Sequence, residues 1–376
     1  MIARPAPPSL HPAHDAPRGG WPPPARLPLL ALGFAALVLG ALAGLARLGV
    51  AVPALAVGAV ADHGPLMVCG FFGVVIALER AVALGRGWAY LGPLLAALGI
   101  VALALGAPVA AAGLFLAGSA VLLAATLDVL RRQPALFTFT LALGAAALVA
   151  GNGLRLAGVA VAEALPWWLA FLVLTIAGER LELSRFLPPS PRARQAFALL
   201  LAVVGAALFA QRLEWGPPLF GAGLLGLAAW LFRQDIARRT VRGRGLTRFI
   251  AVCLLAGYFW LGVGAALFVG GAAAAPGAPA HDAALHAITL GFVFSMVFGH
   301  AAIILPAVTK FALPYHPVFY APLALLQLSL VVRLAGDALA DPAWMRAGGV
   351  LNALALAAFL LNTVAAVLRG RRARRA

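Results

Sequence analysis

The sequence predicts an all-α, polytopic membrane protein with twelve transmembrane helices, and three observations lead to this fold class. First, 63% of the 376 residues are hydrophobic and only 11% are charged, with a mean hydropathy of +0.99. Second, the apolar residues gather in long segments, and third, the basic residues alternate between successive loops. Since soluble globular domains carry roughly 25% charged residues, the composition excludes a soluble fold.

Twelve apolar segments are separated by short polar or Gly/Pro-containing breaks. Each has roughly the 20 residues that a helix needs to cross the hydrocarbon core of a bilayer. No other stretch is long enough to fold independently, so residues 27–369 are expected to form one transmembrane domain. The predicted helices are 27–48, 64–84, 88–106, 108–130, 135–157, 164–186, 193–211, 216–234, 247–270, 281–309, 318–337 and 346–369.

The positions of the Lys and Arg residues test this count independently, because cytoplasmic loops collect basic residues and translocated loops do not. With twelve helices and both termini in the cytoplasm, only five of the 28 Lys and Arg residues fall on the outer side. A missed or surplus helix would disturb this alternation. The five are Arg47, Arg155, Arg212, Arg333 and Arg346.

The two ends of the chain are expected to lie outside the bilayer. Residues 1–26 are rich in proline and predict a disordered cytoplasmic tail, and residues 370–376 form a basic cytoplasmic tail. Contact of the basic inner loops with anionic lipid explains the net charge of +16. The lipid bilayer is therefore the expected partner of these residues, and nucleic acid is not.

An ionisable side chain inside a membrane helix is costly, so each one is a functional candidate. The second, sixth and tenth predicted helices all run from outside to inside, and their polar residues fall at two depths. His63, Met67 and His286 share the outer depth. Histidines that face each other from two helices are the usual axial ligands of a low-spin haem, and His with Met also suits copper.

The inner depth contains Glu79, Glu179 and His300, with Met296 one turn before His300. Carboxylates and an imidazole at one depth would bind a metal ion or relay protons. The alternative for His300, and also for His63, is a hydrogen bond to a neighbouring backbone carbonyl, and His63 could instead be an interfacial residue of the loop "ADHGP". On a regular helix His286 and His300 share one face and lie roughly 21 Å apart, which predicts two separate sites, one in each leaflet.

Arginines beside both glutamates offer a purely structural alternative for the inner depth. Glu79 is followed by Arg80, and Glu179 by Arg180. Buried ion pairs made by these residues would lock helices together without any role in binding or transport. Away from both depths, His281 and His316 are expected in surface loops.

The placement of polar residues on helices 2, 6 and 10 resembles subunit I of the haem-copper oxidases. In that family, twelve helices form three arcs of four around a pseudo-threefold axis, and histidines of helices 2 and 10 hold a low-spin haem. The resemblance implies the same role for His63 and His286. Predicted helices 6 and 7 contain no histidine, so the binuclear centre of that family is not expected.

A closer resemblance is to the NnrS family of twelve-helix membrane proteins, which contain haem and copper and are associated with denitrification and nitrosative stress. Three segments carry it. "HGPLMVCGFFG" from His63 is similar to the histidine-bearing second helix of that family, "AGERLELSRF" to a GGR-like stretch that ends a middle helix, and "HAITLG" from His286 to a late helix beginning HALTVG. The resemblance extends over most of the chain.

The resemblance implies a haem b protein, with copper as a second cofactor, in a bacterial-type cytoplasmic (inner) membrane. Its expected role is in nitric oxide metabolism or nitrosative-stress protection, by binding or sensing a small gaseous ligand or by exchanging electrons with a redox partner. Met296 and His300 are candidates for a second metal site. The alternative is a cofactor-free, proton-coupled transporter of a small molecule, in which Glu79, Glu179 and His300 relay protons.

Overall fold

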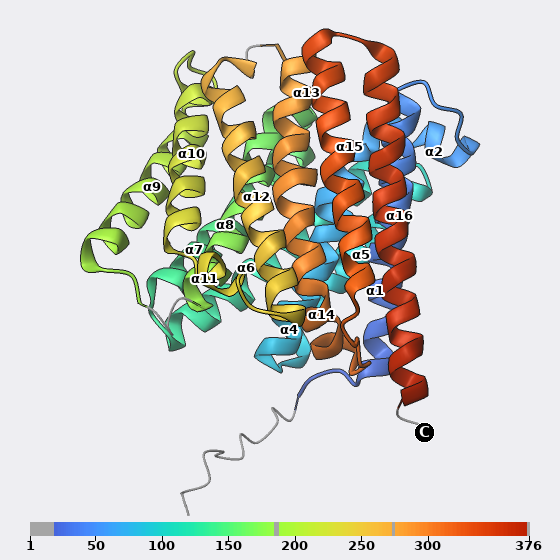
Figure 1. Cartoon of the computed structure of the whole chain (residues 1–376), viewed down its shortest axis with the longest axis vertical. Coiled ribbons are helices and arrows are strands. Elements are labelled where there is room, and N and C mark those ends of the chain that lie inside the picture. Colours follow the sequence, from blue (N-terminus) through green and yellow to red (C-terminus); the bar gives the residue numbers. More distant parts are fainter. Residues whose placement is uncertain (1–18, 184–187, 273–274, 374–376) are drawn as a thin grey trace, which may run out of the picture.

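The computed structural model describes residues 19–183, 188–272 and 275–373, and within these ranges the regular elements are all helices. The long helices stand side by side and span the full depth of one bundle (Figure 1). They are α1 (Pro23–Arg47), Val60–Leu84, Gly87–Ala104, α6 (Pro108–Arg132), α7 (Leu136–Leu156), α8 (Val161–Leu183), α9 (Pro191–Phe209), α10 (Gly216–Gln234), α12 (Gly245–Val269), Pro279–Thr309, Pro317–Leu339 and α16 (Pro342–Ala373).

Several of these crossing helices are composites of shorter elements. Val60–Leu84 comprises η1 (Val60–Asp62), α3 (His63–Pro65), η2 (Leu66–Phe72) and α4 (Gly73–Leu84). Gly87–Ala104 comprises η3 (Gly87–Tyr90) and α5 (Leu91–Ala104). Pro279–Thr309 comprises α13 (Pro279–His286), η6 (Ala287–Phe294) and α14 (Ser295–Thr309). Pro317–Leu339 comprises η7 (Pro317–Phe319) and α15 (Tyr320–Leu339). Two short helices, α2 (Ala54–Gly58) and α11 (Ala237–Thr240), lie in connections.

In the described part of the chain, 11 helices are long and apolar enough to cross a membrane. The remaining predicted segment is α10, whose 19 residues match the prediction for 216–234 but include two prolines and Arg233, which lower its mean hydropathy. At about 1.5 Å per residue it is still roughly 28 Å long, and it runs through the bundle beside α9 and α12 (Figure 1). With α10, an even number of crossings brings both described ends of the chain to one face.

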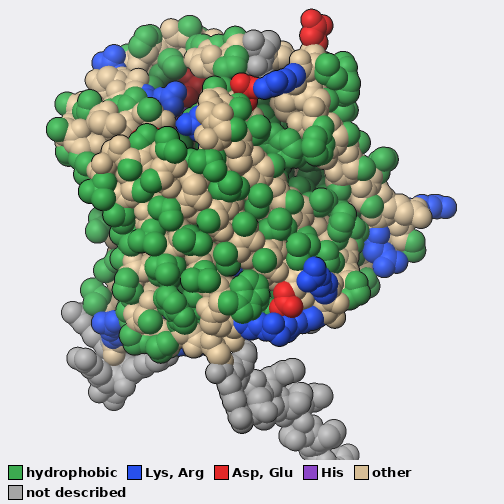
Figure 2. Space-filling model, turned by 180° about the vertical axis from the view of Figure 1, so that it is seen from behind, with side chains coloured by type: hydrophobic (Ala, Val, Ile, Leu, Met, Phe, Trp, Pro, Cys, Tyr) green, Lys and Arg blue, Asp and Glu red, His purple; other side chains and the backbone are tan. Residues whose placement is uncertain are grey.

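We call this face, which bears Pro23 and Ala373, the terminal face, and the opposite one the far face. Between the two faces the surface is apolar, and charged side chains gather towards the ends (Figure 2). Large hydrophobic side chains are exposed along this belt, among them Phe209 at 83% and Leu361 at 71%. Such an extensive apolar surface is unstable in water but suits lipid, so the protein is an integral membrane protein.

The centre of the bundle is made where Val60–Leu84, α8 and Pro279–Thr309 meet. Phe71 stacks on Phe294 with ring centroids 5.9 Å apart, and Phe72 meets Phe294 edge-on at 5.4 Å. The three helices that carry the predicted polar residues therefore pack against one another at the centre of the bundle, an adjacency that the spacing of residues along the sequence did not establish.

Two of these central helices contain π-helical turns, Leu66–Phe72 and Ala287–Phe294. Each begins within three residues after a candidate ligand, His63 or His286. A π-turn inserts an extra residue per turn and rotates everything that follows, and such turns are frequent at functional sites. The prediction that His286 and His300 share a face assumed a regular helix, and this turn lies between them.

The two predicted tails are partly helical where the structure describes them. Pro23 already begins α1, Trp21 stacks on Tyr90 with centroids 5.1 Å apart, and Arg26 donates to the Val308 carbonyl at 2.9 Å. Residues 370–373 continue α16. Residues 1–18 and 374–376 of the predicted tails lie outside the described residues.

Candidate functional site

The three residues predicted at the outer depth line one cavity. His63, Met67 and His286 are in the wall of a cavity of about 450 Å³ near the far face, which we call the His63 cavity. Its walls come from α1, Val60–Leu84, α8, Pro279–Thr309, α15 and α16. The volume lies within the range of about 300–1,000 Å³ that is usual for small-molecule and cofactor sites.

His63 is held against α1 by a pair of glycines one turn apart. A Cβ at Gly44 would lie 2.9 Å from the His63 Cε1 atom, and a Cβ at Gly40 would lie 2.8 Å from the Met67 sulfur, so only glycine leaves room for both side chains. The His63 Nδ1 atom donates to the Gly40 carbonyl at 2.7 Å. Because a carbonyl can only accept, the proton of the neutral ring is on Nδ1, and Nε2 keeps a free lone pair.

His286 is oriented in the same way, with a carboxylate in support. Its Nδ1 atom donates to the Asp282 carbonyl at 2.8 Å and lies 3.2 Å from the Asp282 carboxylate. The Arg333 guanidinium binds that carboxylate at 2.6 Å. A carboxylate behind an imidazole fixes the ring orientation and raises its basicity, which is the arrangement that supports metal-bound histidines.

Sequence reasoning missed two of these supporting residues. The four-residue spacing of "HDAALH" places Asp282 one turn before His286, and this could have been recognised from the helix period. Arg333 was counted only as an outer basic residue, yet it is buried. The expectation that His281 lies in a surface loop was wrong, because His281 is buried in the first turn of α13 and lines the His63 cavity.

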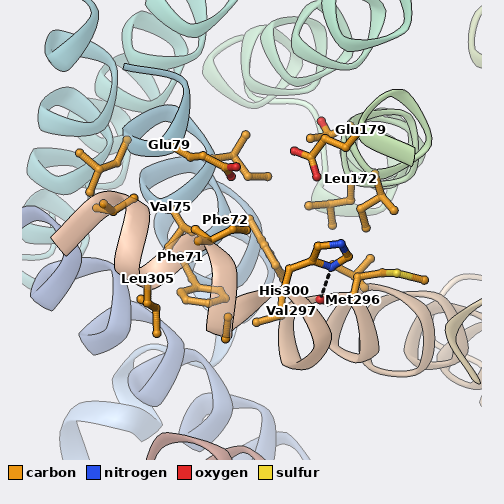
Figure 3. Close-up of a pocket in the computed structure, with 18 of the residues that line it drawn as sticks. Phe71, Phe72, Val75, Glu79, Leu172, Glu179, Met296, Val297, His300 and Leu305 are labelled. Carbon is orange, nitrogen blue, oxygen red and sulfur yellow. Dashed lines mark hydrogen bonds between the residues drawn. The ribbon is translucent and has the colours of Figure 1, made fainter. Parts of the chain in front are cut away.

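The residues predicted at the inner depth line a second cavity, of about 100 Å³, which we call the Glu79 cavity (Figure 3). Glu79 comes from α4, Glu179 from α8, and Met296 and His300 from α14. The carboxyl groups of Glu79 and Glu179 point towards each other across the space, and the His300 ring lies below them in Figure 3. The rest of the wall is almost entirely apolar.

Neither predicted ion pair is formed within the described residues. Arg180 is buried and binds Asp235 instead, with Nε–Oδ2 at 2.7 Å and Nη2–Oδ1 at 3.0 Å, and the Tyr258 hydroxyl donates to Asp235 at 2.6 Å. No hydrogen bond or ion pair to a described residue engages the Glu79 or Glu179 carboxylate. Asp235 follows α10 in sequence, 55 positions after Arg180, so local spacing could not reveal this pair.

Met296 and His300 are not assembled as a metal site. The Met296 side chain extends away from the His300 ring and packs against Gly257 of α12. His300 Nδ1 donates to the Met296 carbonyl at 2.8 Å, and Nε2 lies 3.4 Å from an Arg180 nitrogen, so both ring nitrogens face a partner. Across the described residues, no group of three or more His, Cys, Asp or Glu side chains is arranged to hold a metal ion.

The two cavities are neighbours along the central axis. Phe72 and Leu172 are in the wall of both, so their side chains stand between the two spaces. The chemistry on each side differs. Tethered imidazoles are found towards the far face, and carboxylates without partners among the described residues are found towards the terminal face.

Comparison with known proteins identifies a family for this chain but no named relative. No curated protein and no solved structure is significantly similar to this chain. One family, described as a domain of unknown function (DUF8744), matches residues 26–368, which span all the helices of the bundle. The chain therefore belongs to the DUF8744 family.

Proposed function

We propose that the His63 cavity binds a haem b group between His63 and His286, and that the protein acts in nitric oxide metabolism or protection. The observation that carries the proposal is that the imidazoles of His63 and His286 make the same kind of hydrogen bond. Each donates Nδ1–H to a backbone carbonyl, so each offers Nε2 to the same cavity. Axial ligation of haem requires only two such nitrogens, supplied from facing helices.

The remaining cavity residues fit the other parts of this group. The apolar part of the lining, which includes Leu165 and Leu356, suits a porphyrin ring, and Arg47 provides a cation for a propionate carboxylate. Met67 places a thioether beside His63, which suits copper as an alternative or additional metal. When bound, haem supplies one-electron chemistry and an affinity for small gaseous ligands, and the chain's residues orient and enclose it.

The link to nitric oxide rests on the resemblance of "HGPLMVCGFFG" and "HAITLG" to NnrS motifs, as does the placement in a bacterial inner membrane with cytoplasmic termini. The excess of basic residues towards the terminal face supports that orientation. A binding, sensing or electron-transfer role suits a single site with two histidine ligands.

Proton-coupled transport without a cofactor is the second candidate. The observation in its favour is the alignment of the two cavities, which meet at Phe72 and Leu172 along the bundle axis. Alternating access needs a central route that can open to either side in turn, and two cavities that share the wall residues Phe72 and Leu172 mark such a route through the bundle.

A reduced-minus-oxidised optical spectrum with metal analysis of the purified protein tests the proposal. The parent should contain haem and give a sharp reduced band, His286→Ala should lose both, and His316→Ala, a histidine outside both cavities, should retain them. Retention of haem by His286→Ala would overturn the assignment of ligands. A folded parent that cannot be loaded with haem or copper would leave transport as the better function.

A further inference from the structure

The Glu79 cavity is an unusual feature of a membrane core, because two carboxyl groups line it and no counter-ion among the described residues is bound to either. Glu79 and Glu179 belong to different helices and converge on one cavity of about 100 Å³ (Figure 3). The neighbouring Arg180 is committed to Asp235 by two hydrogen bonds. Two carboxylates close together in a low-dielectric setting are costly unless a proton or a cation lies between them.

The surroundings favour a proton over a metal ion. His300, the third titratable group of the wall, has both ring nitrogens turned to other partners, so it does not complete a ligand set. The carboxyl oxygens do reach the cavity, whose volume has room for several water molecules, since about 10–15 Å³ of such space suffices for one. Carboxyl groups joined through water exchange protons readily.

The cavity lies close to the terminal face. Glu79 comes five residues before the end of α4 at Leu84, and Glu179 comes four residues before the end of α8 at Leu183. At about 1.5 Å per residue, both are within roughly 8 Å of the ends of their helices. A proton therefore has to pass little more than one helical turn to reach the pair from the adjoining aqueous phase.

We propose that the Glu79 cavity is a proton-binding site, in which Glu79 and Glu179 share one proton taken up from the terminal face. A hydronium ion in the cavity transfers its proton to one carboxylate oxygen and leaves water, and the second carboxylate accepts a hydrogen bond from the new hydroxyl. No other bond is broken. The shared proton removes one negative charge from the core, in a cavity that shares Phe72 and Leu172 with the His63 cavity.

Other charged groups face this pair and set the balance of charge around it. Arg80 follows Glu79 on α4, Arg180 and Glu182 flank Glu179 on α8, and His300 faces both from α14. The wall contributed by α1 consists of Leu30 and Phe34 and carries no charge. Because Asp235 neutralises Arg180, one shared proton reduces the net negative charge that Glu182 and the pair leave beside Arg80.

Infrared spectroscopy of the full chain in lipid nanodiscs, without added haem, tests the proposal. Spectra recorded as the pH is lowered should contain the C=O stretching band of a protonated buried carboxyl group, shifted in D2O. Glu79→Gln and Glu179→Gln should each remove or shift this band. Glu163→Gln, a surface glutamate that pairs with Arg212, should leave it unchanged.

Two results would overturn the proposal: no such band at any pH, or a band that survives both substitutions. Circular dichroism of each variant checks that the helices are intact. Because the measurement uses protein without haem, its outcome is separate from that of the haem proposal.

Discussion

The two cavities of this bundle share the same three central helices but treat their polar side chains in opposite ways. In the His63 cavity, His63 is tethered to Gly40 and His286 to Asp282, and Asp282 in turn binds Arg333. In the Glu79 cavity, the carboxyl groups of Glu79 and Glu179 have no such tether among the described residues. Fixed side chains are suited to a ligand of defined geometry, and untethered carboxyl groups to a proton.

The largest expected effect comes from removing the ion pair beside the Glu79 cavity. Arg180→Leu leaves Asp235 buried and unpaired, because the two side chains are only 6% and 3% exposed, so we expect a loss of about 3–5 kcal/mol of stability. Denaturant or thermal unfolding in detergent measures it. Arg212→Leu, which breaks an exposed pair with Glu163, is the control and should have almost no effect. If both variants lost the same stability, burial of the Arg180–Asp235 pair would not be the cause of the loss.

A smaller effect is expected from the carboxylate that supports His286. Under the proposed function, Asp282→Asn keeps the shape of the side chain but removes the charge behind the ring, so haem affinity should fall about 10–100-fold. Titration of the haem-free protein with haem measures this. Asp128→Asn, on an aspartate that pairs with Arg132 outside both cavities, is the matched control. Unchanged affinity in Asp282→Asn would mean that the backbone carbonyl alone orients His286.

The smallest effect is expected from a substitution at Gly44, which lies against the His63 ring. A Cβ at Gly44 comes within 2.9 Å of the ring, so Gly44→Ala should displace the imidazole by a few tenths of an ångström and weaken haem binding by about 1 kcal/mol. The same titration measures it. Gly113→Ala, on α6, adds a methyl group where no atom lies within 4 Å, and it should leave affinity unchanged. Equal affinities for the two variants would show that α1 shifts freely to accommodate the change.

The sequence predicted the depth of the polar residues along their helices well, but it predicted their interaction partners poorly. Hydropathy and the basic residues located each crossing helix, and depth along the helix grouped His63 with His286 and Glu79 with Glu179, as the two cavities bear out. Depth says nothing about which way a side chain turns. The His281 ring was therefore misassigned, since it turns inward, and the packing of the Met296 thioether on α12 was not foreseen.

Long-range partners could not be predicted because nothing in local spacing encodes them. Arg180 is on α8 and Asp235 directly follows α10, so they are far apart in sequence, and only the fold brings them within 2.7 Å. The π-turns after His63 and His286 were also missed, because the apolar residues around them are equally compatible with a regular α-helix. The pseudo-threefold arrangement of three four-helix arcs stays a prediction.

The even number of crossings, which depends on α10, has a practical consequence for anyone who labels this protein. The first described helix starts, and the last one ends, at the same face (Figure 1). Complementary halves of a split fluorescent reporter, one fused to each terminus, would consequently meet in a single compartment. A protease supplied from the other side would meet the connections of the far face instead, among them the one that contains α2.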